Sequence, residues 1–234
     1  MDEIDAALDF RNVSIVTNYR CYRPPQYVGL EMSPTSDRFQ LNNILWKEKI
    51  KKLVNITIDL KTLHKLGYCH KDFHSGNILQ DERFSYISDF GLTGPADKQK
   101  SDDRIYGVLP YIAPEVLNGE PYTLASDIYS FGVIMAEYSS GNPPFYDRKH
   151  DYKLSLDICN GLRPDFGKGT PKFYKKLAYR CMNANPNQRP SGDELKNTLS
   201  QTNPTEEGER TMALRCHVNI KRNSVVAIID TGAA

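Results

Sequence analysis

The chain has 234 residues and a formal net charge of +1 at pH 7. This length suffices to bury a substantial core in one large or two small domains. The near-zero charge gives no reason to expect a nucleic-acid or anionic-lipid partner. Five scattered cysteines without C-x-x-C spacing are typical of reduced thiols, and no segment matches a signal peptide or a membrane span. We therefore expect a cytoplasmic protein.

The first forty residues form an atypical N-terminal segment. Residues 13–16 and 27–30 are short apolar runs that favour strands. The polar cluster at 33–37 is typical of a linker. Gly29 is the only glycine of the segment, so it contains no G-x-G-x-x-G motif.

A long amphipathic helix is predicted from Leu45 to Leu66, because apolar side chains recur there every three or four residues. The stripe comprises Trp46, Ile50, Leu53, Thr57, Leu60 and His64, widened by Val54 and Ile58. Gly67 is the expected stop signal at its C-terminal end. The early lysines at 47, 49, 51 and 52 all fall on this helix, so none is expected on a strand.

The next stretch, residues 70–91, concentrates chemically useful side chains: Asp72, Asn77 and Asp89. Two short apolar runs, 77–79 and 85–87, flank a polar turn and predict a β-hairpin. The hairpin would bring the two aspartates together at one end. Amide and carboxylate oxygens are ligands suited to Mg²⁺, and a carboxylate can orient a hydroxyl or accept its proton.

Further motifs follow in a fixed order. The segment Asp89-Phe90-Gly91 precedes Ala113-Pro114-Glu115, then comes S-D-I-Y-S-F-G from Ser126 and N-P-N-Q-R-P from Asn185. With H-K-D-F-H-S-G-N from His70, these motifs resemble the protein kinase family over residues 41–200, and within it the tyrosine-kinase-like group.

The resemblance implies an α+β, mostly helical fold. Residues 41–200 would form a kinase C-terminal lobe whose short β-hairpin carries the catalytic and magnesium loops. Residues 1–40 would be an N-lobe remnant, with that lobe truncated or absent, because the glycine-rich loop and the strand lysine of the family are missing. Residues 201–234 would be a flexible tail, in which 224–229 are a candidate edge strand.

The resemblance also implies roles for single residues. Asp72 would be the catalytic aspartate, with Lys71 beside it where many kinases have arginine, and Asn77 and Asp89 would hold Mg²⁺ and with it ATP. His70 would support the loop, Asp127 would accept its backbone N–H groups, and Glu115 and Arg189 would form a structural ion pair.

The polar segment from Leu92 to Ile112 resembles an activation segment. Ser101 and Tyr106 are candidate phosphorylation sites within it, although ordinary surface hydroxyls remain the alternative. Two residues depart from the family pattern. His74 replaces the usual phosphate-contacting lysine, and Val108 replaces a threonine.

Three more helices are predicted. One starts near Ser126 and is apolar on all sides, which indicates burial. A second begins at Thr170-Pro171, read as a cap followed by proline, with a buried face containing Tyr174, Leu177 and Cys181. The third begins at the capping box that starts at Ser191.

Two functions stay open at this point. The first is ATP-dependent phosphoryl transfer to serine or threonine, or to tyrosine, of a protein substrate, with weak activity of the chain alone because the phosphate-covering parts are missing. The second is a catalytically impaired, pseudokinase-like module that binds a signalling partner. The sequence predicts no oligomeric state.

Overall fold

The computed structural model describes residues 45–80, 84–96 and 105–201, and the backbone of three strands outside these ranges. Those strands are β1 (Ser33–Pro34), β6 (Arg215–Ile220) and β7 (Asn223–Ile228). The candidate strands at 13–16 and 27–30 lie outside the described residues, as does Ser101.

The described part is mostly helical with small sheets, as the sequence predicts. Its α-helices are α2 (Trp46–Lys65), α3 (Pro114–Leu117), α4 (Leu124–Ser140), α5 (Tyr152–Cys159), α6 (Lys172–Cys181) and α7 (Gly192–Gln201). Short 3-10 turns are η3 (Ser75–Asn77), η4 (Phe90–Leu92), η5 (Leu109–Tyr111) and η6 (Pro186–Gln188). The remaining strands are β2 (Tyr68–Cys69), β3 (Ile78–Gln80), β4 (Ser85–Ile87) and β5 (Gly94–Pro95).

The strands form three small antiparallel sheets. β3 and β4 make the predicted hairpin, with Ile78 opposite Ile87, and β1 adds to the free edge of β3. β2 precedes the hairpin in the sequence and β5 follows it, and these two strands pair with each other. β6 and β7 pair with each other, so the expected strand at 224–229 forms, within a segment that the sequence analysis assigns to a flexible tail.

The predicted long helix is confirmed as α2, and it ends where Gly67 adopts a left-handed conformation with φ of 75°. Its buried face differs in part from the expected stripe. Val54 and Ile58 are only half-buried, whereas Ile56 and Leu63 are fully buried. The apolar residues of this helix are spread widely enough to permit either face, and packing against α7 and β4 selects one of them.

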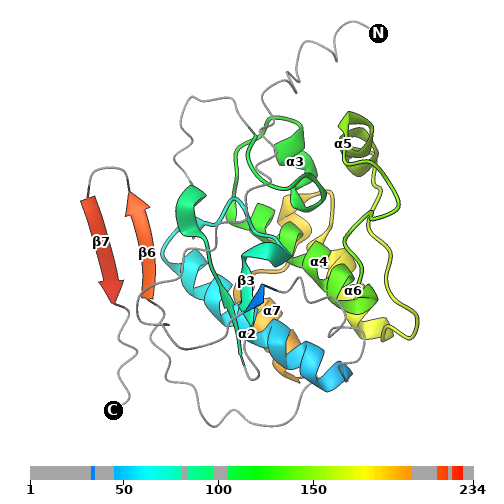
Figure 1. The fold of residues 1–234 in the computed structure, drawn as a ribbon, viewed down its shortest axis with the longest axis horizontal. Coiled ribbons are helices and arrows are strands. Elements are labelled where there is room, and N and C mark those ends of the chain that lie inside the picture. The colour runs from blue at the N-terminus through cyan, green and yellow to red at the C-terminus, as the bar shows by residue number, and fades with distance from the viewer. Residues whose placement is uncertain are drawn as a thin grey trace, which may run out of the picture.

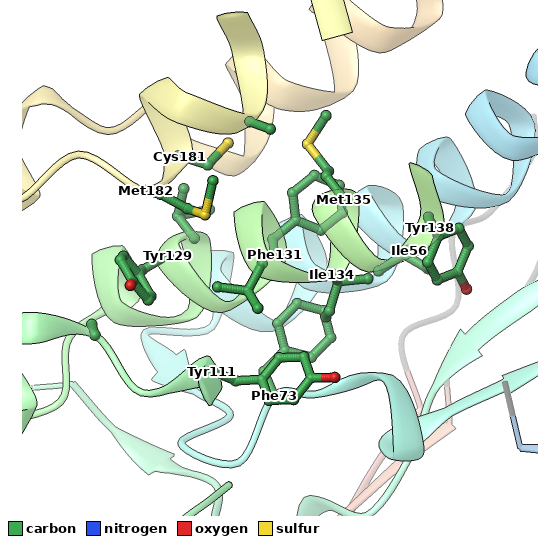
Figure 2. Close-up of a cluster of buried hydrophobic side chains, with 14 of the residues drawn as sticks. Ile56, Phe73, Tyr111, Tyr129, Phe131, Ile134, Met135, Tyr138, Cys181 and Met182 are labelled. Atoms are coloured by element: carbon green, nitrogen blue, oxygen red, sulfur yellow. The ribbon is translucent and has the colours of Figure 1, made fainter. Parts of the chain in front are cut away.

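The centre of the fold is α4, and the prediction that it is buried on all sides is confirmed, since residues 126–139 are all buried. α4 lies against α6 on one side, while α2 lies against α7 (Figure 1). Gly132 makes the close approach to α6 possible, because an added Cβ would lie 2.7 Å from the Met182 side chain and 2.8 Å from that of Cys181. Figure 2 shows Phe73 and Tyr111 packed on the opposite side of α4.

The helix starts are partly as predicted. The Ser191 hydroxyl accepts the Glu194 N–H at the start of α7, 3.2 Å away, as a cap should. The predicted cap at Thr170 is wrong, because Pro171 has non-helical backbone angles and is itself the N-cap of α6, which begins at Lys172. The Thr170 hydroxyl instead donates to the Gly167 carbonyl, 2.6 Å away. The expected buried face of α6 (Tyr174, Leu177 and Cys181) is confirmed.

Among the described residues, no helix combines the length and the apolar character that crossing a bilayer requires.

Candidate active site

The loop from His70 to Asn77 is attached to the core through one carboxylate, that of Asp127 in α4. Asp127 is 2% exposed, and its two oxygens accept the backbone N–H groups of His70 at 2.8 Å and Lys71 at 3.2 Å. The Nε2 atom of His64 in α2 lies 2.9 Å from the same carboxylate. The site loop is therefore held jointly by α4 and α2. Lys71 is held in the left-handed region, with φ of 70°, which is a strained conformation for a lysine.

His70 lies beneath the site loop, fully buried between the rings of Phe73 and Phe90. Its Nε2 atom lies 3.0 Å from the Ser88 carbonyl, which can only accept, so Nε2 carries the proton. Burial lowers the pKa of this imidazole below its ordinary value, against the opposing effect of the Asp127 charge. His70 is therefore a neutral packing residue that ties the site loop to Ser88, directly after β4.

Acid is expected to destabilise the fold through His70. Its pKa is lower in the folded state, so below the ordinary value of 6.5 the unfolded chain binds a proton that the folded chain does not. Stability should fall as the pH drops through this range, by at most about 1.4 kcal/mol per pH unit from this group. Melting temperatures at neutral and mildly acidic pH should converge in a His70→Gln variant, which cannot titrate. His150→Gln, at an exposed site, is the matched control; equal acid sensitivity of both variants would contradict the assignment.

Asp72 stands at the centre of the site loop. The Asn77 amide donates to its backbone carbonyl at 2.8 Å and lies 3.4 Å from its Oδ2 atom. Burial raises the pKa of the Asp72 carboxyl, but the opposing contacts with His74, His70 and Asn77 outweigh burial and leave the pKa below its ordinary value. Asp72 is consequently ionised at neutral pH and has the electronic state of a hydrogen-bond acceptor.

Asn77 and Asp89 are brought to the same end of the hairpin. The Ser88 backbone N–H and hydroxyl both donate to the Asn77 carbonyl, at 2.8 Å and 2.9 Å, which places Asp89 next to the start of β3. Asp89 is exposed and has left-handed backbone angles, with φ of 60° and ψ of 69°. Among the described residues, its carboxylate accepts one long bond, from the Gly91 N–H 3.4 Å away. The carboxylate is thus available to an external ligand.

The donor set of this end fits a hard cation. The NH₂ group of the Asn77 side chain donates to Asp72, and the amide oxygen of the same side chain can act as an acceptor. Amide and carboxylate oxygens are the ligands that Mg²⁺ prefers, usually completed by water and phosphate. Within the described ranges, no group of three or more His, Cys, Asp or Glu side chains lies together as a metal site would need. The two oxygen donors therefore suit Mg²⁺ carried by a phosphate ligand better than a protein-only metal centre.

A second pairing joins residues far apart in sequence. The guanidinium of Arg189 meets the Glu115 carboxylate through two bonds of 2.6 Å. The same group donates to the carbonyls of Asn183 at 2.8 Å and Ala125 at 2.9 Å, and it lies over the Tyr129 ring. With its side chain fully buried, Arg189 ties α3 to the start of α4. These contacts connect structural elements of the fold.

Comparison with known proteins gives the decisive observation. A family model described as Protein kinase domain matches residues 1–199 of the chain. The chain belongs to the protein kinase family. The match includes residues 1–40, which the motif resemblance alone leaves aside, so the truncation of the N-terminal lobe of this kinase chain is not shown.

Several curated kinases are similar to the chain. A probable serine/threonine-protein kinase of Dictyostelium discoideum is 30% identical over 148 residues, which is 62% of this chain and 9% of that protein. A second protein of the same description and organism is 30% identical over 82% of this chain and 25% of its own length. A protein kinase and PP2C-like domain-containing protein of Arabidopsis thaliana is 28% identical over 80% of this chain and 35% of its length. This kinase chain thus spans at most about a third of these relatives.

The described end of the expected kinase activation segment lies against Asp72. Gly107 has φ of 117°, which glycine adopts without strain and other residues do not. A Cβ added there would lie 3.4 Å from the Asp72 Oδ1 atom, which shows how close the segment comes to Asp72. Tyr106 is half-buried, and its carbonyl accepts a hydrogen bond from the Tyr122 hydroxyl. A small pocket lies between this segment and the site loop, lined in part by Lys71 and Val108. The expectation that Tyr106 is a phosphorylation site stays a prediction.

Sequence reasoning missed two contacts of this kinase site. His64 appears in the sequence as one more member of a helical stripe, yet it contacts Asp127. His74 appears as a departure from the family pattern, yet its ring faces Asp72. A polar histidine on an otherwise apolar helix face was the available signal for the first. For the second, Asp72 and His74 are two residues apart in the sequence, but this spacing alone does not show that the two side chains face each other.

Proposed function

We propose that this chain is a protein serine/threonine kinase domain that transfers the γ-phosphoryl group of ATP to a protein hydroxyl. One observation carries the proposal: an ionised Asp72 and the oxygen donors of Asn77 and Asp89 lie at one end of a single hairpin. Phosphoryl transfer depends mainly on positioning and on charge neutralisation, and this end of the hairpin provides groups for both.

Each residue would have a separate task. Asp72 would accept a hydrogen bond from the acceptor hydroxyl and orient its oxygen towards the γ-phosphorus. It would take the hydroxyl proton as the new P–O bond forms and the bond from the γ-phosphorus to the bridging oxygen breaks, with ADP as the leaving group. Asn77 would serve twice, because its NH₂ group holds Asp72 while its amide oxygen would be a ligand for the metal. Asp89 would be the charged metal ligand. Mg²⁺ would supply charge neutralisation on the phosphate oxygens when bound. Lys71, beside Asp72, would add positive charge at the site.

The choice of serine or threonine rests on the names of the similar proteins, several of which are described as probable serine/threonine-protein kinases. The segments from His70 and from Ser126 favour the tyrosine-kinase-like group within the family. A kinase of either hydroxyl preference would use the same Asp72 chemistry. The acceptor residue is therefore a question for the assay rather than for the site geometry.

A pseudokinase-like interaction module is the second candidate. It is favoured by the sequence, which has no G-x-G-x-x-G motif and no V-A-I-K motif, although the family covers ATP phosphates with these parts. Each 1.36 kcal/mol of lost transition-state stabilisation lowers the rate about tenfold. Losing two phosphate contacts would therefore leave a chain that binds partners but transfers phosphate slowly.

A radiolabelled phosphoryl-transfer assay on the full chain separates the two candidates. We expect Mg²⁺-dependent incorporation into protein serine or threonine that falls at least about 100-fold in Asp72→Asn and in Asp89→Asn. Asp147→Asn, at an exposed position of the same chain, is the matched control and should retain the wild-type rate. Equal signal in all four proteins would point to a contaminating kinase. No transfer and no thermal shift with magnesium and ATP would refute the kinase proposal and support the interaction module.

A further inference from the structure

His74 is the least expected residue of the site loop, and it is buried. It is 8% exposed, and its ring lies 5.8 Å from that of Tyr111, measured between centroids. Tyr111 is itself fixed, because its hydroxyl donates to the buried carboxylate of Glu137 at 2.6 Å and lies 3.1 Å from the Ser75 hydroxyl. The imidazole of His74 is therefore held in one orientation by its surroundings.

The hydrogen bond at one ring nitrogen determines the state of the other. The Gly76 backbone N–H donates to Nδ1 of His74 at 3.1 Å, so Nδ1 must present its lone pair. The proton of a neutral ring is then on Nε2. That atom faces Oδ1 of Asp72 at 3.6 Å, slightly beyond an ordinary hydrogen bond. Contacts of this kind are often long in the absence of substrate and shorten in the reacting complex.

Oδ1 is the Asp72 oxygen that needs such a partner. It is buried, and within the described residues no donor reaches it at hydrogen-bond distance. The other oxygen, Oδ2, has the Asn77 amide 3.4 Å away. A Cβ added at Gly107 would lie 3.4 Å from Oδ1, so the backbone of Gly107 lies close to this oxygen. His74 is therefore placed to restrain one oxygen of the carboxylate while Asn77 restrains the other.

We propose that His74, through its Nε2–H group, is a positioning residue that orients the Asp72 carboxylate, at the position where the family resemblance implies a lysine. The inference rests on the proposed function, since orienting Asp72 matters for catalysis only if Asp72 acts on the acceptor hydroxyl. A ring held by Gly76 and Tyr111 has few rotamers, whereas a lysine has four rotatable bonds. His74 thus gives the site a hydrogen-bond donor in a fixed position, whereas a lysine would give it a mobile positive charge.

Turnover measurements test the positioning role. In the full chain, His74→Leu removes the donor at similar volume, and His74→Gln keeps an N–H near the position of Nε2. We expect His74→Leu to lower kcat about tenfold or more while the KM for ATP changes less than about twofold, because ground-state nucleotide binding is left intact. His74→Gln should recover kcat to within about threefold of wild type. His150→Leu, at an exposed histidine, should match wild type.

The tautomer provides a readout that does not depend on activity. In isotope-labelled full chain, the His74 imidazole should show a protonated Nε2 and an unprotonated Nδ1, and the Nε2–H signal should move in Asp72→Asn. An Nδ1–H tautomer, or an Nε2–H signal that ignores Asp72→Asn, would overturn the contact. A wild-type chain with the expected tautomer but without transfer would uphold the contact and refute the kinase proposal. An active wild type whose His74→Leu variant keeps full turnover would overturn the positioning role.

Discussion

Asp127→Ala is expected to destabilise the fold by about 3–5 kcal/mol. The substitution leaves two backbone N–H groups and the His64 ring without their acceptor. Each buried polar group that loses its partner costs roughly 1–3 kcal/mol. Domains of this kind have only about 5–15 kcal/mol of net stability. The melting temperature should therefore fall by roughly 10 °C or more. Because the Asp127 carboxylate holds the backbone of the site loop, any phosphoryl-transfer activity should be lost in this variant.

Denaturant unfolding of the full chain, followed by circular dichroism, measures this effect. Asp147→Ala is the matched control, since that carboxylate is exposed and its removal should change stability by no more than about 0.5 kcal/mol. The loss of stability in Asp127→Asn should lie between those of Asp127→Ala and Asp147→Ala, because the amide oxygen of asparagine can still accept a hydrogen bond from one of the two N–H groups. If Asp127→Ala unfolds at the same denaturant concentration as Asp147→Ala, the anchoring role is wrong.

Arg189→Met is expected to lower the free energy of unfolding by about 3–5 kcal/mol. The substitution leaves the Glu115 carboxylate, whose side chain is only 13% exposed, without its ion-pair partner. The carbonyls of Asn183 and Ala125 also lose their hydrogen-bond donor. The double variant Glu115→Leu with Arg189→Met should lose less than the single variant. It removes the stranded charge, and replacing both members of a buried pair by apolar residues is often nearly neutral.

The chain contains its own control for this second prediction. Arg180 and Glu194 form an ion pair of 2.8 Å whose side chains are 43% and 47% exposed. Solvent screens such a pair, so Arg180→Met should cost no more than about 1 kcal/mol. Equal destabilisation by Arg180→Met and Arg189→Met, measured by thermal unfolding, would show that burial does not govern the value of these pairs.

Local features of the fold were predictable from the sequence. The extent of α2 follows from its apolar period and from Gly67, because a positive φ at a glycine ends a helix without strain. The β3–β4 hairpin follows from two short apolar runs around a polar turn. Burial of α4 follows from apolar residues on every face. Each depends on neighbours within a few residues along the chain.

The errors share one cause. The face of α2 was misjudged at Val54 and Ile58 because several faces of that helix are apolar, and the partner elements choose among them. The cap at Thr170 was misjudged because Pro171 has an extended ψ of 144° and is itself the N-cap, although a proline at this point is also compatible with the first helical position. Neither choice is encoded in a local period.

The amino-acid sequence by itself determined α2, α4, α6 and α7, the hairpin, and the presence of Asp72, Asn77 and Asp89 in one short stretch. Only the tertiary structure decided that the His64 ring contacts the Asp127 carboxylate and that the ring of His74 faces Asp72. The physical reason is that secondary structure arises from short-range backbone and side-chain preferences, whereas the partner of a buried polar group is set by which segments pack together.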